Sequence, residues 1–302
     1  MNLITIDSLT KKYGSLVAVE NFSLTVDRGQ IVALVGPDGA GKTSIFRSIC
    51  GLIAYDNGTI TIDGRDVARE FNQVKHLLGY MPQLFSLYPD LSVKENLSFY
   101  AGLFGLRRDR FDEKKKRLYE FSGLGPFHNR RAGALSGGMK QKLALSCALV
   151  HDPEVLILDE PTTGVDPLSR RQFWDILKDL RRNGSAILVS TPYMDEVALS
   201  DKALFIYEGR KLAEGTPEEL TRQFNGRAYR VKTSPTYACM QQIRKIEGLD
   251  SRRFGSTIHV YTPHDRPIEH FSDRLSQIGI TFDLIEPISP ELEDTFIQMM
   301  SG

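Results

Sequence analysis

A glycine-rich turn that directly follows an apolar run is the feature that most constrains the fold. Residues 36–44 read GPDGAGKTS after the run IVALV, and they fit the pattern G-x-x-x-x-G-K-[ST] through Gly36, Gly41, Lys42 and Thr43. An apolar strand that enters such a turn and continues as a helix is typical of α/β phosphate-binding cores. Glycine lets backbone N–H groups wrap closely around phosphates, so we expect this turn to bind a nucleotide.

Two side chains of the turn have predicted chemical roles. We expect Lys42 to contact the β- and γ-phosphates, and the Thr43 hydroxyl to ligate Mg²⁺. The alternative is a chance glycine-rich turn, and the preceding strand argues against it. The remaining residues of the predicted phosphate cradle are Gly36, Pro37, Asp38, Gly39, Ala40, Gly41 and Ser44.

Two acidic residues end a second apolar run, VLILDEP. They are Asp159 and Glu160, at the carboxyl end of a predicted strand, where open α/β sheets bind their ligands. Phosphoryl transfer to water needs a carboxylate that holds Mg²⁺ and a residue that orients or deprotonates the water. We predict the first role for Asp159 and the second for Glu160. Taken alone, the pair also fits a solvated acidic turn before Pro161.

The order of patterned segments predicts an α/β core. LITIDSL and FSLTVDRG alternate apolar and polar residues, which predicts antiparallel strands. The helical pattern SRRQFWDILKDLRR separates the apolar runs at 155–160 and 186–190, which predicts parallel strands linked by helices. Helical patterns with basic surfaces lie between Gln83 and Ser136, so we expect an inserted helical subdomain at about residues 84–150.

The pattern starts anew at about residue 223, and no nucleotide motif follows. YRVKT, STIHVYT and TFDLIEP read as strands, and ACMQQIRKIEG, IEHFSDRLSQIG and ELEDTFIQMM read as helices. We therefore predict the α/β class with two domains. Residues 1–222 form a nucleotide-binding core with an antiparallel β subdomain and the helical insertion, and residues 223–302 form a small α+β domain of ferredoxin-like type.

Composition bounds the classes of function. The 302 residues contain 38 Lys plus Arg and 38 Asp plus Glu, which offers no excess positive field for nucleic acid. Cys50, Cys147 and Cys239 are far apart and odd in number, so they fit neither a disulfide framework nor a zinc site, and we expect a reducing cytosol. The scattered histidines show no metal-ligand spacing.

The start of the chain and its apolar runs bear on the membrane. MNLITIDSLTKKYG lacks a basic region followed by an apolar stretch, so we expect no secretory signal. The longest apolar runs have the length of strands, well short of the roughly 18 residues that a membrane span needs. If the protein serves a membrane, we expect another chain to supply the membrane part.

A second glycine-rich helix start lies at residues 135–141, LSGGMKQ. One nucleotide does not obviously need two anion-binding helix starts, and alone this segment reads as an ordinary loop and cap. With the other motifs, however, it resembles the ABC ATPase family over about residues 1–222. The resemblance implies that Ser136, Gly137 and Gly138 cap an ATP held by the opposite subunit of a head-to-tail dimer. Met139 departs from the commoner Gln, which bears on fine positioning only.

Other positions match this family one by one. Tyr13, in KKYGSLVAVE, stands where the family stacks an aromatic ring on adenine, although a packed tyrosine is the alternative. Gln83, in GYMPQ, matches a glutamine that senses Mg²⁺ and water, and Asp166, in GVDPLSRR, matches an aspartate that crosses the dimer interface. The resemblance thus implies ATP and Mg²⁺ as cofactors, with a catalytic set of Glu160, Gln83 and Lys42 and a metal set of Thr43, Gln83 and Asp159.

One position departs from the family. Where the family has T-H-x-x-x-E, this chain reads STPYMDE, with Pro192 in place of the histidine. Proline offers no backbone N–H and no polar side-chain atom, so we hypothesise that the ATP site on this chain's Lys42 hydrolyses slowly, in an asymmetric dimer with a faster partner ATPase. We also expect Pro192 to be the first residue of a helix capped by Thr191, and a tightened helix start is the alternative role.

The resemblance also implies partners. The segment after Gln83, LFSLYPDLSVKENLSFYAGLFGL, matches the groove that receives a helix of the membrane subunit, with Leu84, Phe85, Leu87 and Tyr88 as candidates, although such residues are more often core. The chain looks most like exporter ATPases that pair with a separate permease and a second, identical or different, ABC ATPase. It would then be cytoplasmic and peripheral on the inner face of the membrane.

Two rival interpretations stay open. The chain could be a soluble ABC ATPase that acts on ribosomes or nucleic acid, which the neutral charge balance disfavours. It could also be a nucleotide-gated partner that hardly hydrolyses ATP, which Pro192 favours and which Glu160 and Gln83 oppose.

Overall fold

The chain divides into two compact units, Met1–Pro217 and Glu218–Gly302. The computed structural model describes residues 2–84, 86–232, 236–254, 256–277 and 284–301. The first unit contains two sheets and the second contains one, and each unit has its own core. The predicted domain boundary at residues 222 and 223 stays a prediction.

A six-stranded sheet forms the centre of the first unit. Its strands, in order across the sheet, are β10 (Arg210–Gly215), β9 (Lys202–Tyr207), β3 (Ile31–Val35), β8 (Ala186–Ser190), β7 (Val155–Asp159) and β6 (Leu78–Met81). Neighbours from β9 to β6 run parallel, and β10 pairs antiparallel with β9. Every residue of β3, β7 and β8 is buried, as expected for parallel strands covered on both faces.

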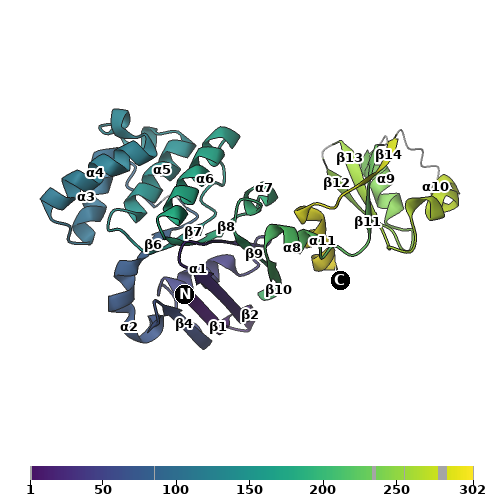
Figure 1. The fold of residues 1–302 in the computed structure, drawn as a ribbon, viewed down its shortest axis with the longest axis horizontal. Coiled ribbons are helices and arrows are strands. Elements are labelled where there is room, and N and C mark those ends of the chain that lie inside the picture. The colour runs from purple at the N-terminus through teal and green to yellow at the C-terminus, as the bar shows by residue number, and fades with distance from the viewer. Residues whose placement is uncertain (1, 85, 233–235, 255, 278–283, 302) are drawn as a thin grey trace. The chain divides into compact units, whose positions relative to one another are not determined.

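Helices on the two faces of this sheet explain that burial. Figure 1 shows α1 (Lys42–Ile49) on one face and α6 (Pro167–Arg182) on the other. Residues Phe173 and Trp174 of α6 are fully buried, as are Ile45 and Phe46 of α1. Because the strands are parallel, the carboxyl ends of β3, β7 and β8 meet at one edge of the sheet, and this edge positions the candidate site.

A four-stranded antiparallel sheet packs beside α1. Its strands, in order, are β2 (Leu16–Asp27), β1 (Asn2–Tyr13), β4 (Asn57–Ile62) and β5 (Arg65–Asp66). Ile4 pairs with Val26 on one side and Ile62 on the other, and all three side chains are buried. They share one core with Leu34 and Leu188 of the six-stranded sheet. The predicted antiparallel strands at the start of the chain are therefore present.

Helices predominate between β6 and β7. They are α3 (Val93–Leu103), α4 (Arg108–Ser122), η2 (Gly125–Phe127), η3 (Ala132–Ala134) and α5 (Gly137–Ala148), while α2 (Val67–Val74) and η1 (Lys75–Leu77) precede β6. α3 begins with a capping box, in which Ser92 Oγ accepts from Glu95 N and Glu95 Oε2 accepts from Ser92 N. Asn96 is fully buried and donates to the backbone carbonyls of Tyr88 and Leu91, so it ties the preceding loop to α3.

The second unit is a four-stranded antiparallel sheet with helices. Along the chain, after α7 (Met194–Val197) and α8 (Pro217–Thr221), come β11 (Arg227–Lys232), α9 (Thr236–Ile243), β12 (Asp250–Phe254), β13 (Thr257–Thr262), η4 (Ile268–Phe271), α10 (Ser272–Gln277), β14 (Leu284–Ile288) and α11 (Leu292–Ser301). The strand order β12-β13-β11-β14 and the βαββαβ sequence agree with the predicted ferredoxin-like arrangement.

One strand of this unit escaped prediction. β12 reads DSRRF and lies at the edge of the sheet. Only Ser251 of this strand is fully buried, and Asp250 forms ion pairs with Arg244 and Arg252, so the segment lacks the apolar alternation that predicts a strand. The first residues of the predicted strand TFDLIEP lie outside the described residues, as does the end of the predicted helix IEHFSDRLSQIG. Both elements continue in the described part as β14 and α10.

A buried carboxylate anchors α11 to β13. Asp294 is fully buried and accepts hydrogen bonds from Tyr261 OH at 2.6 Å and from His259 Nδ1 at 3.1 Å. Its second oxygen accepts from Glu291 N at 2.7 Å. Because each of these donors would be unpaired without the carboxylate, Asp294 fixes the helix on the sheet.

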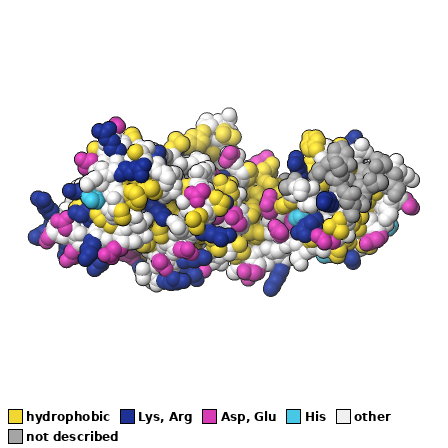
Figure 2. Space-filling model, turned by 90° about the horizontal axis from the view of Figure 1, so that it is seen from above, with side chains coloured by type: hydrophobic (Ala, Val, Ile, Leu, Met, Phe, Trp, Pro, Cys, Tyr) yellow, Lys and Arg dark blue, Asp and Glu magenta, His cyan; other side chains and the backbone are white. Residues whose placement is uncertain are grey.

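Surface charge and helix composition bear on possible partners. In the described residues, no helix is both long and apolar enough to cross a bilayer. Figure 2 shows Lys and Arg side chains interspersed with Asp and Glu on the face that it presents. This mixture agrees with the equal numbers of acidic and basic residues in the sequence.

Candidate nucleotide site

The glycine-rich turn joins the end of β3 to the start of α1, and two of its glycines are sterically required. A Cβ on Gly36 would lie 2.3 Å from the Ile206 carbonyl oxygen, and one on Gly41 would lie 2.5 Å from the Ala18 carbonyl oxygen. Gly41 also has a φ of 102°, which side chains rarely adopt. Neighbouring strands thus press directly on the turn, which explains why these positions are glycine.

The start of α1 is electrostatically suited to an anion. Gly41 is the N-cap, no side chain of the described residues caps the helix, and its first turn contains no acidic residue. The N–H groups and the positive end of the helix dipole are therefore not offset by a carboxylate of the helix itself. Pro37, Asp38 and Gly39 are exposed, while Ala40 is buried beneath them.

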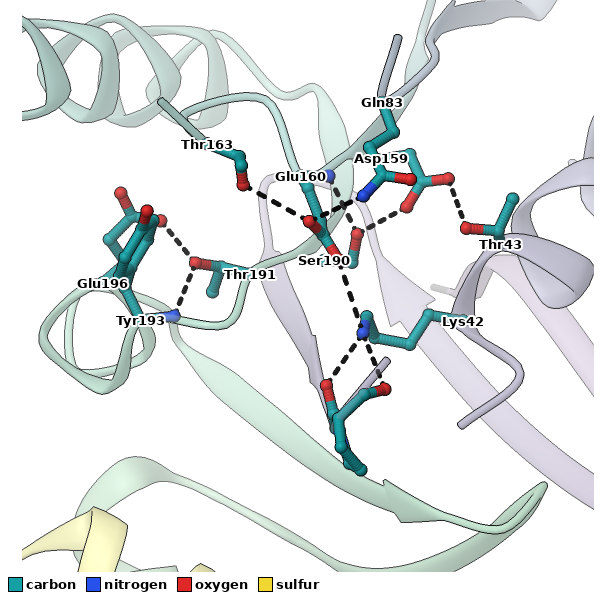
Figure 3. A network of polar contacts seen from close by, with 12 residues as sticks. Lys42, Thr43, Gln83, Asp159, Glu160, Thr163, Ser190, Thr191, Tyr193 and Glu196 are labelled. Atoms are coloured by element: carbon teal, nitrogen blue, oxygen red, sulfur yellow. Dashed lines mark hydrogen bonds and ion pairs between the residues drawn. The ribbon is translucent and has the colours of Figure 1, made fainter. Parts of the chain in front are cut away.

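Lys42 is buried, and nearby oxygen atoms compensate its positive charge. Its Nζ donates to the carbonyl oxygens of Gly36, at 2.8 Å, and Pro37, at 3.1 Å. It also lies 3.4 Å from Glu160 Oε1, a contact drawn as a dashed line in Figure 3. The ammonium group thus lies between the glycine-rich turn and the end of β7. The structure brings together two of the predicted catalytic residues.

Asp159 is the hub of a second set of contacts. Thr43 Oγ1 donates to its Oδ2, and Ser190 Oγ donates to its Oδ1, both at 2.8 Å. Burial raises the pKa of the Asp159 carboxyl, although these hydrogen bonds lower it. Sequence reasoning missed Ser190, for which the only signal is a polar residue at the end of the apolar run AILVS.

Glu160 is held in an unusual backbone conformation. Its φ is 46°, in the left-handed region, and its side chain is almost fully buried. Ser190 Oγ accepts from the Glu160 N–H at 2.9 Å, and Glu160 Oε2 accepts from Gln83 Nε2 at 2.9 Å and from Thr163 Oγ1 at 3.3 Å. Strain of this kind persists where surrounding contacts determine the conformation, and it is concentrated at functional sites.

The turn after β8 differs from the prediction. Pro192 is exposed, but α7 begins only at Met194, with Tyr193 as its N-cap, so a helix that starts at Pro192 was wrong. The Thr191 hydroxyl accepts from the Tyr193 N–H at 3.1 Å and donates to Glu196 Oε2 at 2.6 Å. These two bonds form a side-chain turn at residues 191–193, so the helix begins after this turn.

Tyr13 lies next to the glycine-rich turn. Tyr13 is 46% exposed, and its hydroxyl is 3.3 Å from Ser44 Oγ in the first turn of α1. Lys11 Nζ lies 4.8 Å from the ring centroid. An exposed ring at this position is available for stacking, unlike a core tyrosine.

The second glycine-rich segment packs against the start of α6. Ser136 is the N-cap of α5 and accepts from Met139 N, while Asp166 is the N-cap of α6 and accepts from Ser169 N at 2.9 Å. Hydrogen bonds from Ser169 lower the pKa of the Asp166 carboxyl. A Cβ on Gly138 would lie 2.6 Å from Ser169 Cβ, which explains its glycine, while Gly137 is exposed.

These two helix starts are separate from the Lys42 cluster, by which we mean Lys42, Thr43, Gln83, Asp159 and Glu160. In the part of the chain that the structure describes, Ser136 bonds to its own helix, and so does Asp166. In this described part, neither forms a hydrogen bond or an ion pair with Lys42, Asp159 or Glu160. The predicted nucleotide-binding residues therefore form two groups on one chain.

The candidate permease contacts have mixed environments. Leu84 is 80% exposed and Tyr88 47% exposed, whereas Leu87 is buried, and Phe85 lies outside the described residues. Sequence reasoning missed a cavity of about 200 Å³ between α1, α2, α3 and α5, whose lining includes Leu52, Phe71, Tyr80, Tyr100 and Phe104. These residues come from distant segments of the chain, so no local sequence pattern predicts the cavity.

Comparison with known proteins places this geometry in a family. The family model described as ABC transporter matches residues 19–163. The Probable multidrug ABC transporter ATP-binding protein YbhF of Escherichia coli is 40% identical over 99% of this chain and 52% of its own length, so the chain spans about half of that relative. The Nod factor export ATP-binding protein I of Burkholderia lata is 34% identical over 97% of this chain and 95% of its own length.

A solved structure agrees. One described as the structure of an ATP binding subunit of an ABC transporter is 30% identical, with a TM-score of 0.67, and the match covers 74% of this chain and 93% of that one. The predicted family and fold class are thereby confirmed. Because a relative of nearly the same length shares a third of its residues, and because the glycine-rich turn and the acidic strand end lie together, the chain belongs to the ABC transporter family as one of its ATP-binding proteins.

Proposed function

We propose that the chain binds Mg·ATP at the Lys42 cluster and hydrolyses it to drive a separate membrane permease. The observation that carries this proposal is the position of the Glu160 carboxylate, 3.4 Å from Lys42 Nζ and 2.9 Å from Gln83 Nε2. Phosphoryl transfer to water needs a phosphate-binding cation and a carboxylate that orients the water, and here an amide holds that buried carboxylate in place.

Each residue of the cluster has a distinct proposed task. Lys42, at the start of α1, would bind the β- and γ-phosphates, and the N–H groups of residues 36–44 would surround them. Glu160 would orient the attacking water and accept its proton, while Gln83 would hold the Glu160 carboxylate in place. Tyr13 would stack on the adenine, since its exposed ring lies beside Ser44.

The residues around Asp159 fit a magnesium ion. Thr43 Oγ1 and Asp159 Oδ2 are hard oxygen donors within 2.8 Å of each other, as Mg²⁺ prefers. Burial raises the pKa of Asp159, whereas a cation beside it would lower this pKa and favour the ionised form. When bound, Mg²⁺ would neutralise phosphate charge, with Gln83 as the third predicted contact.

A second ABC ATPase would complete the site. Ser136, Gly137, Gly138 and Asp166 lie at the starts of α5 and α6, separate from this chain's Lys42 cluster. In a head-to-tail pair, they would face the nucleotide on the neighbouring chain, and the neighbour's equivalents would face Lys42. This arrangement gives both groups of residues a task.

Export through a permease is the proposed biological role. The relatives named for multidrug transport and for Nod factor export support this role. The cavity of about 200 Å³ lined by Leu52, Tyr100 and Phe104, with the exposed Leu84 and Tyr88 in the loop before α3, would receive a helix of the permease. The chain would then be peripheral on the cytoplasmic face of the membrane.

Pro192 favours a slow site on this chain. It follows Ser190 and Thr191 at the end of β8, next to Asp159 and Glu160, and its ring offers no hydrogen bond to a phosphate. In this variant of the proposal, the chain pairs with a different ATPase that has the faster site.

Two substitutions test the main proposal. Glu160→Gln should bind ATP, pair more stably in its presence, and lose at least about a hundredfold in turnover, as expected of a general base. Lys42→Ala should lose both turnover and ATP binding. Binding would be measured with a fluorescent nucleotide, pairing by light scattering, and turnover by phosphate release. Full turnover in Glu160→Gln would overturn the proposed role of Glu160, and unchanged ATP affinity in Lys42→Ala would overturn the site itself.

A further inference from the structure

A buried carboxylate ties together the two turns that follow β7 and β8. Glu196, in α7, is 2% exposed. Its Oε1 accepts from Thr162 Oγ1 at 2.7 Å, and its Oε2 accepts from Thr191 Oγ1 at 2.6 Å. Thr162 follows Glu160 by two residues, and Thr191 follows Ser190 directly. We call Glu196, Thr162 and Thr191 the Glu196 clamp. Figure 3 shows Thr191 of this clamp with its bonds to Glu196 and to Tyr193.

Arg170, in α6, supplies the charge that faces this carboxylate. Its Nη1 lies 3.9 Å from Glu196 Oε1, and its guanidinium carbon lies 4.3 Å from the centroid of the Tyr193 ring. Nη1 is buried, and among the described residues it has no hydrogen-bond partner. The contact is therefore electrostatic and stacking rather than a hydrogen bond, and it compensates a buried carboxylate that would otherwise be costly.

The same arginine connects the clamp to the start of α6. Arg170 N donates to the carbonyl oxygen of Asp166, the N-cap of that helix, at 2.9 Å. Ser169, which precedes Arg170, packs against Gly138 of α5. A displacement of the α5 and α6 helix starts would therefore move Arg170, and with it the charge that faces Glu196.

Glu160 depends on its surroundings for its conformation. Its φ of 46° is unfavourable for a side chain, and the turn that leaves it is fastened at Thr162. On the β8 side, Pro192 contributes no N–H and no polar side-chain atom, so that turn is fastened through Thr191 and Glu196.

We propose that Glu196 and Arg170 are positioning residues for Glu160, and that they act through the Thr162 hydroxyl. The inference rests on the proposed hydrolytic function, since Glu160 is the candidate base. Neither residue contacts the reacting atoms. Glu196 holds the turn after Glu160, and Arg170 makes that hold depend on the position of α6.

The first test is Glu196→Gln in the full chain, with phosphate release measured across ATP concentrations. The amide preserves the shape but removes the charge that faces Arg170, so kcat should fall about tenfold while KM for ATP changes less than about twofold. Asp195→Asn is the matched control, because the Asp195 carboxylate is 4.0 Å from the same Arg170 Nη1 but 73% exposed. An unchanged kcat in Glu196→Gln, or an equal fall in Asp195→Asn, overturns the proposal.

A second pair of variants decides the matter even if Glu196→Gln fails to fold. Thr162→Val keeps the shape of the side chain and removes the hydrogen bond to Glu196, whereas Thr162→Ser keeps the hydroxyl. We expect the valine variant to lose about tenfold in kcat and the serine variant to stay within about twofold of the wild type. Equal kcat values for the two variants would contradict a positioning role of this contact.

Glu160→Gln, measured in parallel, separates this inference from the function on which it rests. If the wild type hydrolyses ATP, Glu160→Gln does not, and Glu196→Gln matches the wild type, then only the positioning role is overturned. If the wild type releases no phosphate in the presence of Mg·ATP, the proposed function fails, and the positioning role fails with it.

Discussion

Gln83 Nε2 donates a 2.9 Å hydrogen bond to Glu160 Oε2, which joins the end of β7 to the segment that leads into α3. Gln83 lies two residues beyond the end of β6, on the exposed surface, whereas Glu160 is buried. A change at the loop that carries Leu84 can therefore reach the candidate base through a single hydrogen bond. In the proposed complex with a permease, this hydrogen bond would be a direct physical route from the loop to the site.

Removing this hydrogen bond should slow turnover without weakening ATP binding. In Gln83→Ala, Glu160 keeps only Thr163, among the described residues, as a donor to Oε2, so its orientation is less restricted, and we expect a fall of about tenfold or more in kcat. Phosphate release and fluorescent-nucleotide binding would measure the two quantities. Gln172→Ala, an exposed glutamine on α6, is the control and should leave both unchanged. A kcat equal to that of the wild type would argue against the orienting role.

Ser190→Ala should destabilise the first unit. The substitution removes the donor to Asp159 Oδ1 and leaves the Glu160 N–H without its acceptor, and both groups are buried. Losing these partners should cost about 1–3 kcal/mol in the free energy of unfolding. Urea denaturation would measure the loss. Ser98→Ala is the control, since its exposed hydroxyl donates to Lys94 O on the same helix, and it should change stability by less than about 0.5 kcal/mol.

Pro192→His should raise steady-state turnover if the slow-site hypothesis holds. The imidazole would restore a hydrogen-bonding group at the end of β8, beside Thr191 and the Asp159 cluster. We expect a gain of at least about tenfold in kcat, in line with one added hydrogen bond to a charged group. Pro192→Ala separates the effect of imidazole from that of losing the ring. No gain in the histidine variant would sink the hypothesis.

The buried His151 should make stability depend on pH. Burial lowers the pKa of His151 to about 4, and its Nε2 donates to the Leu78 carbonyl oxygen. The unfolded chain, with a histidine pKa near ~6.5, takes up the proton first. His151 therefore contributes stability that is complete above about pH 6.5 and is lost as pH falls towards 4, by roughly 2–3 kcal/mol.

His151→Gln checks this sign. Glutamine can still donate to Leu78 O but does not titrate, so the loss of stability between about pH 6.5 and 4 should shrink. Urea denaturation at a series of pH values would measure it. His128→Gln is the comparison variant, at a histidine bonded to Gly125 O. The idea would be contradicted by identical pH dependence in the wild type and His151→Gln.

Asp294→Ala should unfold the second unit selectively. It leaves the Tyr261 hydroxyl and His259 Nδ1 buried without an acceptor, which should cost about 3 kcal/mol or more. Calorimetry of the full chain should show the loss in one transition while nucleotide binding at Lys42 is retained. Asp265→Ala, at an exposed carboxylate, should be neutral. A loss of ATP affinity in Asp294→Ala would instead indicate coupling to the nucleotide site.

Local patterns predicted most of the site residues but not their contacts. The glycine-rich turn and the acidic strand end follow from residues next to each other in the chain, so they could be recognised directly. Ser190, Thr163 and Glu196 could not, because a serine, a threonine or a glutamate at the end of an element is common. Their role appears only where the side chains meet Asp159, Glu160 and Thr162.

The turn at Pro192 shows how tertiary contacts override a local preference. Proline suits the first position of a helix, which predicted a helix start there. The buried Glu196 carboxylate instead draws the Thr191 hydroxyl, and Thr191 in turn accepts the Tyr193 N–H, so the helix begins at Met194. A preference worth a fraction of a kcal/mol gives way to hydrogen bonds to a buried charge, which contribute roughly 1.5–3 kcal/mol each.

The sequence by itself determined the order of most strands and helices, the glycine-rich turn around Lys42, and the acids at the end of β7, because each is a pattern of residues that lie close together along the chain. The steric need for glycine at positions 36 and 41 comes from the fold, since the carbonyl oxygens that a Cβ would meet belong to Ile206 and Ala18. Only the tertiary structure decided which side chains meet. Thr43 and Asp159 are 116 residues apart, and Gln83 and Glu160 are 77 apart. Their contacts arise because parallel strands bring their carboxyl ends to one edge of a sheet, and burial at that edge makes each unpaired polar group costly.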